Sequence, residues 1–185
     1  MAMKETGSIR VLLTEEQIQE RIRQLGKQIT RDYEGKTLLM VGILKGSCMF
    51  LCDLAKRVEL DVRMDFMSVS SYGSQMTTSG KVQIKKDLEN NIKGKDVLII
   101  EDIIDSGMTM SKLLPLLRER EPASLRVCTF LDKPSRRQVP LQADYTGFAV
   151  EDAFIVGYGL DYDEKYRQLP YVACLEGLEM KGWIL

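Results

Sequence analysis

Acidic side chains gather near the end of one apolar segment of the chain, residues 97–109, which reads VLIIEDIIDSGMT. An apolar run of this kind predicts a strand buried in a parallel sheet. Glu101, Asp102 and Asp105 come where such a strand reaches the edge of the sheet. Two neighbouring carboxylates are well suited to holding a sugar diol, or a hydrated Mg²⁺ beside it.

The turn after this strand combines hydroxyl side chains with a glycine at the start of a predicted helix. Backbone N–H groups at a helix N-terminus, together with the Ser106 and Thr109 hydroxyls, can bind a phosphate. Gly107 lets the backbone approach a ligand closely. Acidic residues at a helix start also have a purely structural use, because they complement the helix dipole. Three carboxylates around a turn of small residues exceed what capping requires, which favours a phosphate or sugar-phosphate site.

The composition limits which other chemistry is available. The chain has no histidine, which excludes histidine triads, facial-triad iron sites and HExxH zinc sites. Proton transfer must then use Asp, Glu, Lys, Tyr or Cys side chains, and a metal ion is expected to meet oxygen ligands, which points to Mg²⁺. The cysteines form no CxxC pair and are predicted to be buried, reduced thiols: Cys48, Cys52, Cys128 and Cys174.

Charge and hydropathy exclude two further classes of partner. The net charge of −1 gives no basic surface of the kind that binding to nucleic-acid phosphates usually needs. No apolar run approaches membrane-spanning length, and the first ten residues lack the pattern of a secretory signal. The sequence therefore predicts a cytoplasmic protein that binds neither nucleic acid nor a membrane.

Strands and helices alternate along the chain, which at 185 residues is expected to form one domain, residues 1–185. This alternation predicts an α/β fold with an open, mainly parallel sheet and helices on both faces. Ligands bind such sheets beyond the carboxyl ends of the strands. The predicted helices are 14–30, 48–57 and 107–120, and the predicted strands are 37–43, 60–66, 81–85, 96–100, 125–131, 145–150 and 154–157.

The run EDIIDSGMT resembles the phosphoribosyl-diphosphate motif of the type I phosphoribosyltransferases, two acidic residues in a hydrophobic run followed by Asp-Ser/Thr-Gly-x-Thr. The block FIVGYGLDYDEKYR narrows the resemblance to the hypoxanthine-guanine phosphoribosyltransferases, with further matches at Leu44-Lys45-Gly46, Ser71-Tyr72 and Lys133. The resemblance covers nearly the whole chain. It implies the type I phosphoribosyltransferase fold, a mainly parallel twisted sheet with helices on both faces. A small hood is expected from the termini, mainly about residues 150–185.

The resemblance also implies an activity in purine salvage. The 5-phosphoribosyl group of phosphoribosyl diphosphate would pass to hypoxanthine or guanine, giving IMP or GMP and pyrophosphate, with Mg²⁺ as cofactor. Glu101 and Asp102 are implied to hold the ribose hydroxyls and Mg²⁺, and Asp105 to act as general base at N7 of the purine. The residues implied to bind the 5′-phosphate are Ser106, Gly107, Met108 and Thr109, and those implied to bind pyrophosphate are Lys45, Gly46 and Arg167.

For the purine, the resemblance implies stacking on Phe154, backbone contacts from Ile155 and a contact of Lys133 with the 6-oxo group. Asp161 is implied to lie near the base or a second Mg²⁺. Without the resemblance, Phe154 is typical of a core side chain, Lys133 of a solvated turn and Asp161 of the surface. Residues 68–80, with Ser71 and Tyr72, are expected to form a mobile loop that closes over the site and excludes water.

Alternative functions remain open at this point. One is a phosphoribosyltransferase for xanthine, adenine or a pyrimidine. Another is a non-catalytic nucleotide-sensing protein or a regulator of the same fold that binds RNA or DNA, which is expected to carry a basic face or an added DNA-binding segment. Relatives of the resembled family form dimers and tetramers, so a homodimer or homotetramer is expected by analogy.

Overall fold

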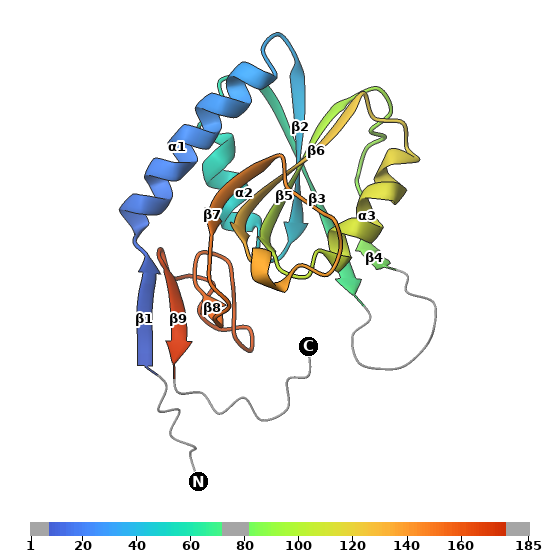
Figure 1. Cartoon of the computed structure of the whole chain (residues 1–185). Helices are drawn as coiled ribbons and strands as arrows, with labels where there is room; N and C mark the ends of the chain where they lie inside the picture. The colour runs from blue at the N-terminus through green and yellow to red at the C-terminus, as the bar shows by residue number, and fades with distance from the viewer. Residues whose placement is uncertain (1–7, 72–81, 177–185) are drawn as a thin grey trace.

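A six-stranded sheet forms the centre of the protein in the computed structural model, which describes residues 8–71 and 82–176 (Figure 1). The strand order is β4-β3-β2-β5-β6-β7. All neighbours pair in parallel except β4, which is antiparallel to β3. The mainly parallel α/β sheet is therefore confirmed. The strands are β2 (Thr37–Leu44), β3 (Asp61–Ser71), β4 (Val82–Lys86), β5 (Asp96–Ile104), β6 (Ser124–Asp132) and β7 (Tyr145–Ala149).

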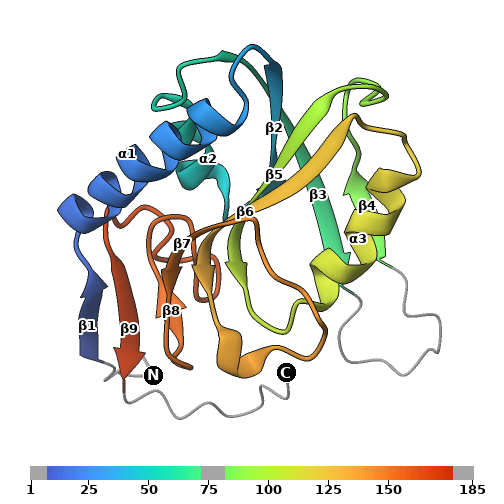
Figure 2. The same ribbon diagram turned by 45° about the horizontal axis from the view of Figure 1, so that its top comes forward.

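Helices cover both faces of this sheet, as predicted (Figures 1 and 2). α1 (Glu15–Asp32) and α2 (Cys48–Ala55) lie on one face, and α3 (Met108–Arg118) lies on the other. A capping box starts α1: the Thr14 hydroxyl accepts from the Gln17 N–H at 3.3 Å, and the Gln17 side chain accepts from the Thr14 N–H at 2.8 Å. These two bonds satisfy backbone donors that the first turn of a helix leaves unpaired.

The apolar strands fill two separate layers of core. Met40 and Ile100 point toward the face covered by α1 and α2, whereas Val41 and Ile99, their neighbours in sequence, point toward α3. Alternate side chains of a strand face opposite sides of a sheet, so a strand covered on both faces must be apolar throughout. This explains the continuous apolar runs of β2 and β5.

A second, three-stranded sheet lies beyond the end of β2 (Figure 1). Its order is β1-β9-β8, from β1 (Ser8–Leu13), β9 (Val172–Glu176) and β8 (Ile155–Val156), with both neighbouring pairs antiparallel. The sequence reasoning missed β1 and β9. Both strands are short, and the pairing that stabilises them joins segments about 160 residues apart, for example Ser8 with Glu176.

The polar stretch 68–80 was expected to form a loop from its first residue, but it begins as a strand. Ser68 to Ser71 continue β3, and Ser70 pairs with Gln83 of β4. Backbone pairing stabilises this polar strand end, so hydrophobic periodicity gives no signal for it. Tyr72 and the rest of the stretch lie outside the described residues, and the lid stays a prediction.

The prediction of buried, reduced thiols is confirmed only in part. All four cysteines are free; Cys128 and Cys174 are buried as predicted, whereas Cys48 and Cys52 on α2 are only partly buried. In the described part of the chain, no helix combines the length and apolar character needed to span a membrane.

Candidate active site

The site lies where the strand order changes direction. From β2 the chain passes to β3 on one side and later to β5 on the other, which creates a topological switch point between β2 and β5. Lys45 and Gly46 follow β2, and Glu101 and Asp102 lie on β5. A Cβ built on Gly46 would lie 1.5 Å from Oδ2 of Asp102. The loop after β2 therefore touches the acidic pair directly, and only glycine fits there.

Glu101 and Asp102 form a poorly solvated pair of carboxyl groups. Glu101 is 8% exposed, its Oε1 accepts from the Asp102 N–H at 3.3 Å, and Oδ1 of Asp102 accepts from the Ile103 N–H at 2.8 Å. Burial, and then the neighbouring Asp102, raise the pKa of Glu101 well above its usual value. Burial also raises the pKa of Asp102, although hydrogen bonds and the Arg167 charge oppose it. A cation or sugar hydroxyls would stabilise the ionised pair.

The turn after β5 surrounds a cavity of about 240 Å³. Gly107 has φ +81° and precedes the first residue of α3, and Ser106 Oγ accepts from the Met108 N–H at 3.3 Å. The Met108 side chain is not among the lining groups. Its backbone shapes the turn instead. The cavity is lined by Ile43, Leu44, Val69, Glu101, Ile103, Ile104, Asp105, Ser106, Gly107, Thr109 and Met110.

Two arginines that the sequence reasoning missed hold the turn at Asp105. Arg136 Nε lies 3.1 Å from Oδ1 of Asp105, in an ion pair whose geometry is not that of a hydrogen bond. Arg137 Nη1 donates to the Asp105 carbonyl at 2.6 Å and also pairs with Asp132. Oδ1 of Asp105 is thus a buried acceptor with no hydrogen-bond donor. Adjacent arginines just after Lys133 were the available sequence signal.

Lys133 links this turn to the segment that carries Phe154. The Lys133 N–H donates to the Ile104 carbonyl at 2.9 Å, and its ammonium donates to the Ala153 carbonyl at 2.7 Å. Lys133 is 7% exposed, which rules out a solvated turn lysine. Phe154 is only partly buried, with its ring edge-on to Tyr162 at 5.4 Å. Lys133 therefore joins the residue before Asp105 to the residue before Phe154, while Ile155 is buried in β8.

Arg167 is bound within its own segment, residues 157–167. Its Nη1 donates to the Gly159 carbonyl at 2.8 Å, and its Nη2 lies 2.8 Å from Oδ1 of Asp161. The other Asp161 oxygen accepts from the Glu164 N–H at 2.9 Å. Arg167 Nε is buried and has no hydrogen-bond partner. Both Asp161 oxygens are therefore engaged locally, and Arg167 keeps one buried donor unused.

The same segment closes against the loop after β2. A Cβ on Gly159, which has φ +101°, would lie 2.0 Å from the Gly46 carbonyl oxygen. Lys45 Nζ lies 2.7 Å from Oε2 of Glu164, with both side chains largely exposed. The Leu44–Lys45 peptide bond is cis. The structure thus brings Lys45, Gly46 and the segment of Arg167 together. Glu164 is a further member, which the sequence reasoning did not single out although it lies in the block FIVGYGLDYDEKYR.

A metal ion would need ligands from outside the protein. Among residues 8–71 and 82–176, no three Asp, Glu, His or Cys side chains gather closely enough to hold one. Mg²⁺ usually binds one or two protein carboxylates and completes its octahedron with substrate oxygens and water. Glu101 and Asp102 fit that pattern, because their paired burial leaves negative charge to be compensated. The structure does not join Asp161 to them in a three-ligand group.

Comparisons with known proteins agree on one relationship. The family model for the phosphoribosyl transferase domain matches residues 11–163. The hypoxanthine-guanine phosphoribosyltransferase of Bacillus subtilis is 50% identical over 167 residues, which cover 90% of this chain and 93% of that protein. The hypoxanthine phosphoribosyltransferase of Salmonella typhimurium is 52% identical over 172 residues, which cover 92% and 96%.

Two further similarities concern length and structure. The bifunctional protein TilS/HprT of Listeria monocytogenes is 52% identical over 167 residues, and the chain spans only 26% of its length. A crystal structure of a hypoxanthine phosphoribosyltransferase from Staphylococcus aureus superposes with a TM-score of 0.87 at 52% identity, covering 90% of this chain and 91% of that one.

Proposed function

The chain belongs to the phosphoribosyltransferase family, in the group of hypoxanthine phosphoribosyltransferases, and we propose that it is a purine-salvage enzyme. It transfers the 5-phosphoribosyl group of phosphoribosyl diphosphate to hypoxanthine or guanine. The products are IMP or GMP and pyrophosphate. The cytoplasmic location and the homodimer or homotetramer expected from the sequence stay predictions.

One observation carries this proposal. Gly46 packs against Asp102 on one side and against Gly159 on the other, with no space for a Cβ on either glycine. Three parts of the chain therefore meet at Gly46: the loop that carries the exposed Lys45, the buried acidic pair, and the segment of Arg167. Acidic groups suit ribose hydroxyls and cationic groups suit pyrophosphate, so this point matches two adjoining parts of one substrate. The 5′-phosphate would occupy the cavity at residues 105–109.

Each part of the site has a role in the proposed reaction. N9 of the purine attacks C1′ of the ribose while the bond from C1′ to pyrophosphate breaks. Positive charge develops on the ribose and negative charge on the leaving group, which Lys45 and Arg167 stabilise. Asp105 accepts the proton that N7 loses. Its buried Oδ1, which lacks a hydrogen-bond donor and lies 3.1 Å from Nε of Arg136, supports that role.

Mg²⁺ is the cofactor in this proposal. Glu101 and Asp102 would hold it together with oxygens of phosphoribosyl diphosphate. When bound, it supplies positive charge that neutralises the sugar diphosphate and the departing pyrophosphate. The raised pKa values of both carboxyls support this assignment, because a nearby cation would favour their ionised forms.

For the base, the proposal assigns recognition of the 6-oxo group to Lys133. An ammonium group has three donors, and the Ala153 carbonyl occupies one of them. A second donor remains for an oxygen at C6, where adenine carries an amino group instead. Phe154, next to Ala153 and only partly buried, is available to stack on the purine.

A steady-state assay tests the proposal. The purified protein is incubated with phosphoribosyl diphosphate, Mg²⁺ and, in turn, hypoxanthine, guanine, xanthine and adenine. We expect transfer to hypoxanthine or guanine, and use of adenine reduced by roughly 10⁴, as for a site built around a hydrogen bond that the analogue cannot make. Preference for xanthine or adenine would reassign the substrate. No transfer to any base would overturn the proposed function.

A further inference from the structure

Tyr158 is a buried residue of the FIVGYGLDYDEKYR block to which the proposed chemistry assigns no role. Gly157, Tyr158 and Gly159 all have positive φ, with values of 95°, 49° and 101°. The ring of Tyr158 is 5% exposed and lies 4.9 Å from that of Phe130 in the core. A non-glycine residue with positive φ is uncommon, and surrounding contacts must hold it there.

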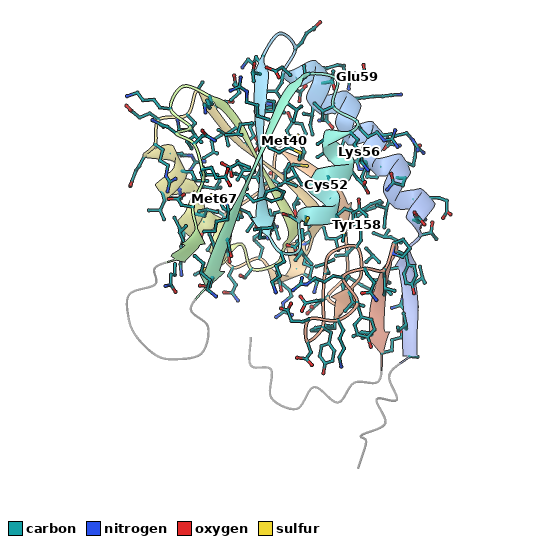
Figure 3. All side chains as sticks on the ribbon, turned by 180° about the vertical axis from the view of Figure 1, so that it is seen from behind. Met40, Cys52, Lys56, Glu59, Met67 and Tyr158 are labelled. Carbon is teal, nitrogen blue, oxygen red and sulfur yellow. The ribbon has the colours of Figure 1, made fainter. Side chains whose placement is uncertain are left out.

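The hydroxyl of Tyr158 provides such a contact. It donates to Oδ2 of Asp53, on α2, at 2.7 Å. Asp53 is itself fixed by Lys56, whose Nζ lies 2.6 Å from Oδ1, and by Gln19 of α1, which donates to Oδ2 at 3.0 Å. Figure 3 shows Tyr158 next to the helix that carries Cys52, with Lys56 directly after its last residue. The bond therefore joins the segment 157–167 to α2.

The protonation states of Tyr158 and Asp53 agree with a hydrogen bond in which the phenol donates and the carboxylate accepts. Burial and the bond to Asp53 raise the pKa of Tyr158, so the phenol keeps its proton. Burial opposes ionisation of Asp53, yet hydrogen bonds from Lys56, Tyr158 and Gln19 hold its pKa below the usual value. A protonated phenol that donates to a carboxylate is a strong, charge-assisted hydrogen bond.

Both residues of this hydrogen bond, Tyr158 and Asp53, lie on segments that contain or adjoin the proposed pyrophosphate site. α2 begins directly after the loop that contains Lys45 and Gly46. On the other side, Gly159 follows Tyr158, touches the Gly46 carbonyl and receives the Arg167 guanidinium on its own carbonyl at 2.8 Å. The Gly159 N–H in turn donates to the Arg167 carbonyl at 2.9 Å. A shift of Tyr158 would therefore move Arg167 relative to Lys45.

We propose that Tyr158 is a positioning residue for the pyrophosphate end of the substrate, acting through Asp53 and Gly159 on Gly46 and Arg167. This inference rests on the proposed function. Tyr158 itself contacts no reacting group. Its hydroxyl sets the gap between the two cationic groups, so its removal weakens binding of phosphoribosyl diphosphate and leaves recognition of the base unchanged.

The test compares two tyrosine-to-phenylalanine variants. Tyr158→Phe removes the hydroxyl and keeps the ring. Tyr145→Phe is the matched control, because the Tyr145 hydroxyl also donates to a carboxylate, Oδ2 of Asp32, at 2.7 Å. Tyr145 begins β7, at the edge of the sheet away from the site. Binding of phosphoribosyl diphosphate with Mg²⁺, without base, is measured by calorimetry, alongside KM for both substrates and the melting temperature.

We expect Kd and KM for phosphoribosyl diphosphate to rise about three- to tenfold in Tyr158→Phe, because only part of the free energy of this hydrogen bond reaches a site that the hydroxyl does not touch. KM for hypoxanthine should stay within about twofold, whereas Tyr145→Phe should lower the melting temperature similarly and change neither KM. Unchanged Kd in Tyr158→Phe would make the bond merely structural and overturn the proposal.

A second variant keeps the test decisive if Tyr158→Phe is unstable. Asp53→Ala removes the acceptor and should weaken phosphoribosyl-diphosphate binding at least as much, and the double variant should add little, because both changes break one bond. Additive losses would contradict the proposal. If the wild type binds phosphoribosyl diphosphate but transfers it to no base, the proposed function fails, and the Kd comparison still decides the role of Tyr158. Wild-type protein that does not bind it overturns both.

Discussion

Two walls of the site are held in place by different means. The sheet-edge wall, residues 101–109, continues β5, whose neighbours pair with it as far as Ile104 with Asp132. The folded-back wall, residues 157–167, has only two isolated bridges, Gly157 with Leu160 and Tyr162 with Lys165. Six of its residues have positive φ: Gly157, Tyr158, Gly159, Asp163, Glu164 and Tyr166. Its shape depends on side-chain and backbone contacts with the rest of the protein.

This difference suggests that the two walls contribute to different steps, one to turnover and the other to substrate binding. Groups on a sheet edge keep their geometry through the backbone ladder, which suits groups that must meet a reacting atom accurately. The folded-back wall is joined to the other through Gly46 and Lys45, and its two isolated bridges restrain its backbone less than a continuous ladder does. We expect changes at the sheet edge to affect turnover, and changes in the folded-back wall to affect substrate affinity.

The largest effect is expected for Asp105→Asn, at the sheet edge. Loss of a general base should lower kcat by roughly 10² to 10⁴, while the side chain keeps its shape and the cavity its lining. Titration calorimetry with phosphoribosyl diphosphate should give a Kd close to that of the wild type. Near-normal turnover would remove Asp105 from the mechanism and break the assignment of chemistry to this wall.

Lys133→Met, beside the sheet edge, should have the next largest effect. Loss of a charged hydrogen bond to the 6-oxo group should reduce kcat/KM with hypoxanthine about 10- to 100-fold. Adenine use should stay near its low baseline. The variant also leaves the Ala153 carbonyl without its donor, so the melting temperature is measured as a control. Intact turnover with hypoxanthine would show that another residue recognises the 6-oxo group of the purine.

Gly159→Ala tests the folded-back wall. Its Cβ would meet the Gly46 carbonyl at 2.0 Å, so the wall must move, and KM for phosphoribosyl diphosphate should rise about tenfold for a strain of 1–3 kcal/mol. Gly94→Ala is the matched control, because Gly94 also has positive φ, at 70°, but nothing lies within 4 Å of its Cβ. It should lose stability without a change in KM. Equal KM values in both variants would contradict the division between the walls.

The smallest effect concerns stability and pH. The raised pKa values of Glu101 and Asp102 mean that these two groups bind more protons in the folded protein than in the unfolded chain. Carboxyl groups whose pKa is lowered by folding, such as Asp87 and Asp96, are ionised in both states above about pH 6 and do not contribute to the pH dependence there. The free energy of unfolding of the ligand-free protein should therefore fall as pH rises through the raised values. Glu101→Gln should flatten this dependence and raise the melting temperature of the ligand-free protein at pH 8, because the amide carries no charge to be buried.

Glu59→Gln is the control for that experiment, since Glu59 is exposed and lies away from the acidic pair. Its unfolding curves should follow the wild type at every pH. A wild-type stability that rises between pH 5 and 8, with no difference for Glu101→Gln, would show that the acidic pair is not the destabilised group.

The sequence alone determined the architecture and the sheet-edge wall. Apolar runs such as 37–43 and 96–100 predict strands covered on both faces, and Thr14 with Gln17 predicts the start of α1; the structure has both features. The acidic pair, Asp105 and the turn are consecutive in the chain. Because a strand and the turn after it are local structures, residue types and spacing are enough to place such groups together.

The position of the folded-back wall, strands β1 and β9 and the contact of Arg136 with Asp105 became clear only from the tertiary structure. The pairing of β1 with β9, the contact of Gly46 with Gly159 and the ion pair of Lys45 with Glu164 join residues more than 100 positions apart. Arg136 beside Asp105 depends on how the chain leaves β6. Such contacts follow from packing of the whole chain and leave no periodic pattern in the sequence. The burial that raises the pKa values of Glu101 and Asp102 likewise exists only once both layers of core have formed.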